Sequence, residues 1–336
     1  MTDWIDVRSR RRPRCVGSLL LWTTRAGAFL PLALTQRLGA FLGWLADVTP
    51  SKRRRVAAAN LTACFPGLSP EELRALRRRV MLHSGRLFGE MPAAWFRSRD
   101  YWSRRLDTSE FDSRARALMS RGAGLIIALP HLGNWELGNH GLSAVGELTA
   151  LYRPPRRPAL EPLLRAGRER SNVRMVPTDQ SGLREVCRTL RNGRAVVVLP
   201  DQTPRRHNPG TVLAPFFEMP ALTMTLLSRL SRRCGSPVLF GYFERRPAGR
   251  FALRCVEADP AISSGNLMEA ATALNAGVER CVRRCPDQYQ WTYRRFKRSN
   301  SRNAPDYAAT DPTVPPGRPW EDPATAGIRK GKTTAA

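Results

Sequence analysis

The stretch that decides the fold is Gly124-Leu-Ile-Ile-Ala-Leu-Pro-His-Leu-Gly-Asn-Trp-Glu136. Its first half is a short, uninterrupted apolar run, which is typical of a buried strand. Pro130 ends the run, and residues 134–143 can begin a helix. A strand, a turn and a helix in this order predict a βα unit. The unit puts the imidazole of His131 at the edge of a sheet, where ligands usually bind.

The same alternation continues through the middle of the chain. The apolar runs and the helical segments between them are Leu148–Tyr152, Pro158–Arg170, Ser181–Asn192, Ala195–Leu199 and Val238–Phe243. This spacing is typical of parallel strands joined by crossover helices. Residues Phe251–Val256 follow a turn and predict an antiparallel strand, and Leu267–Arg284 predicts a further helix. We therefore expect an α/β fold with a mostly parallel central sheet flanked by helices.

Helical patterns precede the first predicted strand. Val56–Leu61 and Glu71–Leu82 carry apolar residues at helical spacing. Ser69, Pro70 and Glu72 form the signature of a helix N-terminus, with a capping hydroxyl, a proline at the first helical position and an acid three residues after the cap. These segments predict a helical region over residues 56–120.

His131 and Glu136 are the candidate catalytic pair. Five residues on an α-helix correspond to a rotation of roughly 140°, so the two side chains cannot share one helical face. They meet only if His131 lies in the turn before the helix and Glu136 lies in its first turns. The carboxylate then fixes the tautomer of the imidazole, as a general base that acts on a hydroxyl requires. The alternative is a histidine that is only a hydrogen-bonded structural residue.

Arginine dominates the charge of the chain. The 336 residues include 55 Lys and Arg against 28 Asp and Glu, which gives a formal net charge of +27. Such a surface attracts polyanions, including nucleic acids, anionic lipids, phosphorylated substrates and acidic proteins. A basic nucleic-acid-binding protein is the alternative from another functional class. Because the arginines are scattered and no recognition helix or RNA-stacking motif is evident, we expect no nucleic-acid partner.

The seven cysteines do not have the paired Cys-x2-Cys spacing of zinc sites. Reduced thiols with a packing role are therefore expected, on a chain that faces the cytosol. No metal site is expected.

The N-terminal 50 residues combine basic clusters with apolar sequence. Residues 1–14 form a basic arm, and residues 15–50 form an interrupted apolar segment. Its longest uncharged run, Ala26–Gln36, is shorter than the roughly 20 residues that a membrane span requires. Since basic clusters flank both ends, we expect an interfacial or shallow hairpin anchor of membrane-associated helices, with Trp22 and Trp44 near the lipid headgroups. A helix pair packed on a soluble domain is the alternative.

Three further segments carry polar or aromatic residues near predicted strand ends. They are Leu151-Tyr-Arg-Pro154, Val198-Leu-Pro-Asp-Gln202 and Pro215-Phe-Phe217. With His131 and Glu136, this ordered set resembles the lipid A biosynthesis acyltransferases (lauroyl and myristoyl acyltransferases) of the glycerolipid acyltransferase superfamily. In that family the His131–Glu136 spacing is the HX4(D/E) motif. The stretch Asn60–Pro66, the later Glu90 and the ending Trp291–Lys297 add to the resemblance, which covers roughly residues 15–298.

The resemblance implies an acyltransferase domain at residues 51–298, followed by a Pro-, Asp-, Thr- and Gly-rich tail at 299–336 that we expect to be disordered. It implies an enzyme at the cytoplasmic face of the bacterial inner membrane. That enzyme moves an acyl chain from acyl carrier protein, or from coenzyme A, to a hydroxyl of an acidic lipid A precursor, without a cofactor. A phosphatidylinositol mannoside, an ornithine lipid or a lysophospholipid is the alternative acceptor.

Each candidate residue receives an expected role. His131 removes the proton of the acceptor hydroxyl, Glu136 orients the imidazole, and the attack on the thioester is direct. The backbone N–H groups of residues 132–134 are plausible donors to the oxyanion. Arg153 is a candidate ligand of an acceptor phosphate or carboxylate. The remaining expected substrate-binding residues are Asp201 and Gln202, which could instead cap a turn, and Phe216 and Phe217, which could line an apolar groove or pack in the core.

Two further features qualify the resemblance. Glu218 stands where family members often have glycine, so the local turn there is uncertain. Arg294, Arg295 and Lys297 could meet a lipid headgroup or form only a solvated basic face.

Overall fold

The computed structural model describes residues 14–152, 155, 160–169, 173–204, 210–299, 301, 304, 305 and 307, and all structural statements below concern this part of the chain. The predicted basic arm lies outside it except for Arg14. Of the predicted tail, Tyr307 is buried, and its hydroxyl hydrogen-bonds to Asn60. This residue therefore packs on the domain.

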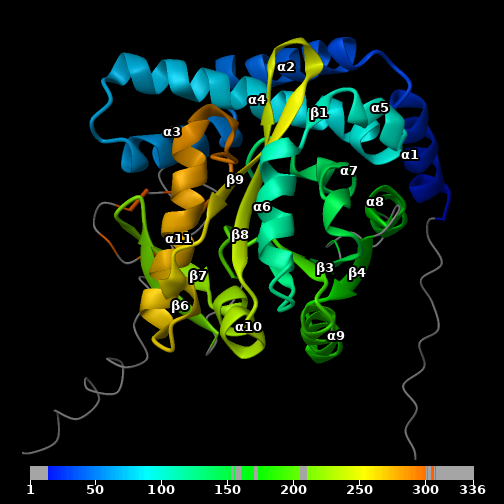
Figure 1. The fold of residues 1–336 in the computed structure, drawn as a ribbon. Coiled ribbons are helices and arrows are strands. Elements are labelled where there is room, and N and C mark those ends of the chain that lie inside the picture. The colour runs from blue at the N-terminus through cyan, green and yellow to red at the C-terminus, as the bar shows by residue number, and fades with distance from the viewer. Residues whose placement is uncertain are drawn as a thin grey trace, which may run out of the picture.

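A seven-stranded sheet forms the centre of the molecule, in the order β1-β9-β8-β2-β5-β3-β4 (Figure 1). All neighbouring strands are parallel except β8 and β9, which are antiparallel. The strands are β1 Leu106–Asp107, β2 Leu125–Ala128, β3 Leu148–Tyr152, β4 Val173–Pro177, β5 Ala195–Val198, β8 Val238–Arg245 and β9 Phe251–Glu257. The predicted α/β fold with a mostly parallel sheet is confirmed, as is the antiparallel pairing of the 251–256 segment.

Helices cover both faces of the sheet and one end of it (Figure 1). One buried apolar cluster joins the sheet to α3, α4, α9, α10 and α11, and a second joins it to α4, α5, α6 and the α7 region. The α-helices after the first two are α3 Lys52–Cys64, α4 Pro70–Phe96, α5 Arg99–Ser103, α6 Ser109–Met119, α7 Gly138–Gly141, α8 Glu161–Arg168, α9 Gln180–Arg191, α10 Leu226–Cys234 and α11 Leu267–Arg284. Short 3-10 turns include η1 Trp135–Leu137, η2 Ser143–Val145 and η6 Pro286–Gln288.

The predicted N-terminus of α4 is confirmed. The hydroxyl of Ser69 accepts from the N–H of Glu72 at 3.2 Å, and the Glu72 carboxylate accepts from the N–H of Ser69 at 2.7 Å. This reciprocal capping satisfies two backbone donors that the first helical turn leaves open, with Pro70 at the first helical position. The cap fixes where a 27-residue helix begins.

Helices α1 (Arg14–Gly27) and α2 (Leu32–Val48) form a bent pair, with α2 along the top of the view in Figure 1 and α1 at its right-hand side. In the described residues no single helix is long and apolar enough to cross a membrane. The segments 20–27 and 32–48, bent by 118°, meet that test only together. Gly39 lies so close to Gly85 of α4 that a Cβ on either would collide with the other's backbone. Helix α2 is thus attached to α4 through close backbone contact.

The opposite side of this pair is apolar and exposed. Its exposed large side chains are Leu20, Trp22, Phe29, Leu30, Leu34, Leu38, Phe41, Leu42, Leu45 and Val48, with Phe88 of α4 beside them. This many exposed large apolar side chains on two consecutive helices is unusual for the surface of a soluble domain. Trp44 is half-buried and stacks on Phe41 with ring centroids 5.7 Å apart.

A separate two-stranded hairpin, β6 (Thr211–Phe216) with β7 (Met219–Met224), packs against α11. Its turn residues Phe217 and Glu218 both have positive φ, at 49° and 62°. Two left-handed residues are what a tight hairpin turn requires, and glycine is the usual solution. Glu218 adopts this conformation without glycine, and the N–H of Phe217 donates to the carboxylate of Glu279 at 2.8 Å.

Candidate active site

His131 lies in a short loop that several backbone contacts hold at the carboxyl edge of the sheet. The N–H of Gly133 donates to the carbonyl of Gln288 and that of Asn134 to the carbonyl of Phe243, at 3.1 and 3.0 Å. Gly133 has a φ of +67°, and a Cβ there would collide with the carbonyl of Phe243. The loop therefore requires glycine, and it presents the imidazole at a fixed position.

The carboxylate partner of His131 is Asp201. Its Oδ1 lies 2.7 Å from Nδ1 of His131, and its Oδ2 accepts from the backbone N–H of the same residue at 3.0 Å. Asp201 is 3% exposed. Burial alone would raise its pKa, but the neighbouring imidazole and these hydrogen bonds hold the pKa below its usual value. Because a carboxylate only accepts, Nδ1 carries a proton in this contact, and Nε2 is the ring nitrogen that faces Gln202.

Strand register explains how Asp201 reaches His131. Strands β2 and β5 are parallel neighbours in which Ala128 pairs with Val198. Each strand continues with Leu-Pro, so His131 and Asp201 both stand three residues beyond this pair. Two adjacent parallel strands with the same ending bring the base and its acid level with each other.

Gln202 and Trp135 complete the surroundings of the ring. The amide nitrogen of Gln202 lies 3.2 Å from Nε2 of His131 and donates to Oε1 of Gln290 at 3.1 Å. Trp135 meets the imidazole edge-to-face, with ring centroids 4.9 Å apart. Gln202 thus lies beside His131 and lines the same cavity.

Glu136 does not hydrogen-bond to His131, so the predicted orienting role is corrected. Its Oε2 accepts from Nε1 of Trp95 at 2.7 Å and from Nε of Arg168 at 2.9 Å, while Oε1 accepts from Nη2 of Arg168. Burial alone would raise the pKa of Glu136, but the Arg168 guanidinium outweighs burial and lowers it. The reason for the correction is local: residues 135–137 form a 3-10 turn, which directs this side chain toward α4 and α8.

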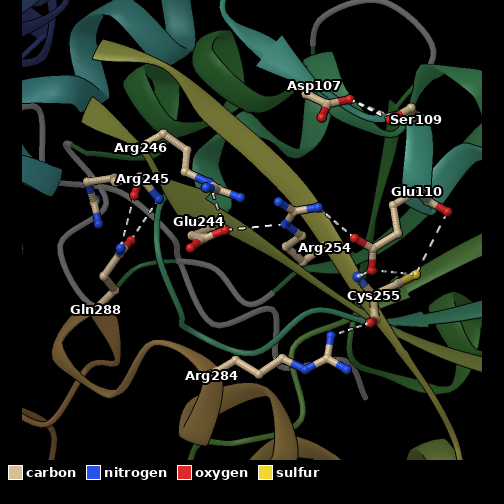
Figure 2. Close-up of polar contacts among 10 residues, drawn as sticks. All are labelled: Asp107, Ser109, Glu110, Glu244, Arg245, Arg246, Arg254, Cys255, Arg284 and Gln288. Carbon is tan, nitrogen blue, oxygen red and sulfur yellow. Dashed lines mark hydrogen bonds and ion pairs between the residues drawn. The ribbon is translucent and has the colours of Figure 1, made fainter. Parts of the chain in front are cut away.

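A buried ion pair supports the loop that carries His131. Both oxygens of Glu90 accept from Nε of Arg245 at 2.8 Å, and they also accept from Asn134 and Gln36, each at 2.9 Å. Glu90 is fully buried. Arg245 exchanges two further hydrogen bonds with Gln288 through its backbone N–H and carbonyl (Figure 2). Four distant segments are thereby locked around the His131 loop.

The predicted oxyanion donors are not available. The N–H of Leu132 donates to the carbonyl of Pro130 at 2.7 Å, and those of Gly133 and Asn134 donate to the carbonyls given above. These backbone groups pin the loop and do not face a substrate. The prediction was wrong because the helix start was expected to leave its first donors open.

A cavity of about 1040 Å³ opens beside His131, Glu136, Arg168 and Gln202. One branch follows the sheet face below α7 and is lined by apolar side chains, namely Leu142, Leu148, Ala150, Val173, Met175 and Val197. A second branch reaches the opposite face, at the first turns of α9 and α10, where Leu183, Leu226 and Arg229 line it. The cavity has the size of a small-molecule site, and the imidazole of His131 lies at its wall.

The remaining predicted site residues have different outcomes. Arg153 lies outside the described residues. Phe216 and Phe217 are 1% and 3% exposed and do not line the cavity. They pack against Tyr289, Trp291 and Phe296, so the alternative of core packing is correct. Arg295 is buried and donates to the carbonyl of Leu222, so it cannot meet a lipid headgroup.

Arg168, Trp95 and Gln290 are site residues that the sequence did not reveal. Arg168 lies among several arginines in an unremarkable helix, and only its fold neighbours distinguish it. Among the residues that the structure describes, no cluster of three His, Cys, Asp or Glu side chains could hold a metal ion. The six cysteines whose side chains are described are all free thiols.

Comparisons with known proteins identify the family of this chain. The family model for bacterial lipid A biosynthesis acyltransferases matches residues 8–298. The chain is 30% identical to the lipid A biosynthesis palmitoleoyltransferase of Escherichia coli over 288 residues, 84% of this chain and 89% of that protein. It is 28% identical to the lauroyltransferase of lipid A biosynthesis from the same organism, over 80% of this chain and 87% of the relative. A lipid A biosynthesis acyltransferase of Haemophilus influenzae is 26% identical over 273 residues. The chain is therefore an acyltransferase of the bacterial lipid A biosynthesis acyltransferase family.

Proposed function

We propose that this acyltransferase moves an acyl chain from a thioester to a hydroxyl of a lipid A precursor, with His131 as the general base. The observation that carries the proposal is the pairing of His131 with Asp201 at the wall of a largely apolar cavity. A phosphatidylinositol mannoside, an ornithine lipid or a lysophospholipid would present the same hydroxyl chemistry. The relatives named for lipid A favour the first acceptor.

The reaction proceeds by direct attack. Nε2 of His131 takes the proton of the acceptor hydroxyl as its oxygen bonds to the thioester carbonyl carbon. The tetrahedral intermediate then collapses, the carbon–sulfur bond breaks, and the imidazolium returns the proton to the leaving sulfur. Asp201 holds Nδ1 protonated throughout and stabilises the imidazolium, since the ion pair forms in a buried place. General-base action of this kind contributes about 10² to 10⁴ in rate.

The branch below α7 suits the acyl chain. Its wall includes Leu148 at the start of β3 and Tyr152 at its end. Four residues of strand span about 13 Å at about 3.3 Å each. An extended hydrocarbon chain beside this strand would contact apolar side chains along that span. Burial of apolar methylenes stabilises the bound chain by about 0.8 kcal/mol each.

Acyl carrier protein or coenzyme A is the proposed donor, and both carry the thioester chemistry described above. Both are acidic, so the formal charge of +27 favours either. A proposed cytoplasmic-face location at the bacterial inner membrane follows from the lipid acceptor. The exposed apolar face of α1 and α2, with Trp22 67% exposed, supports an interfacial anchor there.

Three measurements test the proposal. Purified enzyme should transfer acyl groups from acyl carrier protein or coenzyme A to a lipid A precursor, as followed by mass spectrometry of the product. The His131→Ala variant should lose about 10² or more in kcat while keeping its thermal unfolding transition. Normal turnover by this variant would exclude His131 as the base. Lipids from cells lacking the protein should lack one acyl chain on lipid A.

A further inference from the structure

We infer that Arg168 binds a phosphate of the lipid acceptor, and that Glu136 is a positioning residue that acts through Arg168 and not through His131. This inference rests on the function proposed above. It assigns a ligand to the part of the cavity that the base does not touch.

The contacts of Glu136 carry the first half of the inference. Its side chain is 4% exposed, and both carboxylate oxygens accept from Arg168. The third contact, from Trp95, completes its hydrogen bonds on the side away from the cavity. Meanwhile Nδ1 of His131 is occupied by Asp201. Glu136 interacts with His131 only through charge, whereas its hydrogen bonds within the described residues go to Arg168 and Trp95, so we assign its main contribution to the guanidinium that it holds.

Arg168 remains accessible to a ligand. Its side chain is 31% exposed and lines the cavity together with His131. A guanidinium has five N–H donors in a planar fork, and Glu136 uses those on Nε and one on Nη2. No other acceptor among the described residues hydrogen-bonds to it. The outer donors can therefore form the paired contacts that suit a phosphate.

The position of α8 indicates which substrate carries that phosphate. Helix α8 packs against both α1 and α4. Helix α1 belongs to the bent pair with the exposed apolar face, where a lipid would arrive. An acceptor lipid that enters past α1 meets Arg168 before it reaches His131.

The test compares Arg168→Gln, Arg168→Lys, Glu136→Gln and the double variant Arg168→Gln/Glu136→Gln. Arg165→Gln is the matched control, because Arg165 lies one turn earlier on α8 and pairs with Glu169 at the surface. The substrates are an acyl-carrier-protein thioester, a phosphorylated lipid acceptor and the same acceptor after phosphatase treatment. For each variant, kcat and its pH profile, the KM of both substrates and the thermal transition are measured.

We expect Arg168→Gln to raise the KM of the phosphorylated acceptor roughly 10- to 100-fold, with kcat and the donor KM changed less than about twofold. The acceptor KM of Arg168→Lys should lie between those of the wild type and Arg168→Gln, since a lysine keeps the charge but lacks the planar fork. Glu136→Gln should also raise the acceptor KM without altering the pH profile of kcat. The acceptor KM of the double variant should be no higher than that of Arg168→Gln alone. With the dephosphorylated acceptor, wild type and Arg168→Gln should have the same KM. Arg165→Gln should match the wild type.

Several results would overturn the inference. A fall in kcat at unchanged acceptor KM would mean that Arg168 acts on the oxyanion. A rise in the donor KM alone would place the phosphate on the donor. A changed pH profile of kcat in Glu136→Gln, or additive effects on the acceptor KM in the double variant, would mean that Glu136 acts on His131 directly. An inactive wild type would instead refute the proposed function itself, so the two failures are distinguishable.

Discussion

The Asp201→Asn substitution is the sharpest test of the base assignment. In the wild type, Oδ1 of Asp201 accepts from the imidazole at 2.7 Å, and Oδ2 accepts from the backbone N–H of His131 at 3.0 Å. An asparagine amide offers one accepting oxygen and one donating nitrogen in nearly the same shape. One of the two donors on His131 must then lose its partner, or the ring must move its proton to Nε2. Either outcome removes the oriented base.

The structure sets limits on how much stability and how much kcat the Asp201→Asn variant should lose. A buried donor without an acceptor costs about 1–3 kcal/mol, whereas a domain of this kind is stable by about 5–15 kcal/mol, so the variant still folds. Catalysis depends on the free lone pair at Nε2, and loss of a general base lowers the rate by about 10² to 10⁴. We therefore expect kcat to fall by at least a hundredfold, with a modest decrease in stability.

The assay is the initial rate of acyl transfer, with thermal unfolding measured on the same preparations. His131→Ala is the reference for a missing base, and Gln290→Ala, which removes the side-chain acceptor of Gln202, is a neighbouring comparison. The kcat of Asp201→Asn should approach that of His131→Ala. If Asp201→Asn keeps more than about a tenth of wild-type kcat with an unchanged pH profile, the carboxylate is not the partner of the base.

The same residue predicts how stability depends on pH. The pKa of Asp201 in the folded protein lies below the ordinary value of 3.8, so its ionised form stabilises the fold. That contribution is present above about pH 4 and is lost as the pH falls through the lower folded value. Asp201→Asn should therefore be less stable than wild type in urea at pH 7, and the difference should shrink below pH 4. A constant difference at both pH values would contradict the lowered pKa.

Three further predictions concern the support of the site and the cavity. Glu90→Ala should destabilise the protein by about 3–5 kcal/mol, since Arg245 would stay buried without its carboxylate, and a denaturation midpoint equal to wild type would contradict this. Gly85→Val should lower the thermal transition, at a cost of about 1–3 kcal/mol, because its side chain would collide with Gly39; an unchanged transition would mean that α2 is not held by this contact. Ala150→Phe should fill the branch below α7 and shift the preference toward shorter acyl thioesters by roughly tenfold in kcat/KM, and an unchanged preference in a competition assay would place the acyl chain elsewhere.

Local sequence patterns predicted the elements of this fold well. Apolar runs ended by proline marked β2 and β5, and the reciprocal cap marked the start of α4. The hairpin of β6 and β7 was not predicted as a separate sheet, because its alternation is broken by Pro215 and Pro220. Such patterns depend on neighbours in the chain, and most of the fold is encoded at that range.

The candidate site was predicted only in part, because its contacts join distant segments. His131 was identified from its place after a strand. Glu136 was assigned to it on the expectation that His131 lies in the turn and Glu136 in the first turns of the helix, but the 3-10 turn directs that carboxylate to Arg168, 32 residues away. A local sequence pattern does not predict which helix a side chain will contact at the edge of a sheet. The partners of Glu90, up to 155 residues apart, are of the same kind.

The sequence nevertheless contains a repeated pattern that indicates the pairing of His131 with Asp201. The dipeptide Leu-Pro follows both β2 and β5. The next residue is His131 after β2 and Asp201 after β5. If two parallel strands with identical endings are neighbours in register, the residues after them face each other, and Ala128 does pair with Val198. The local sequence does not say that β5 lies beside β2. A slip of one residue would also turn every side chain of the strand to the opposite face, so the buried valines of β5 hold the register that keeps the acid beside the base. Catalytic geometry in this enzyme is therefore a consequence of core packing.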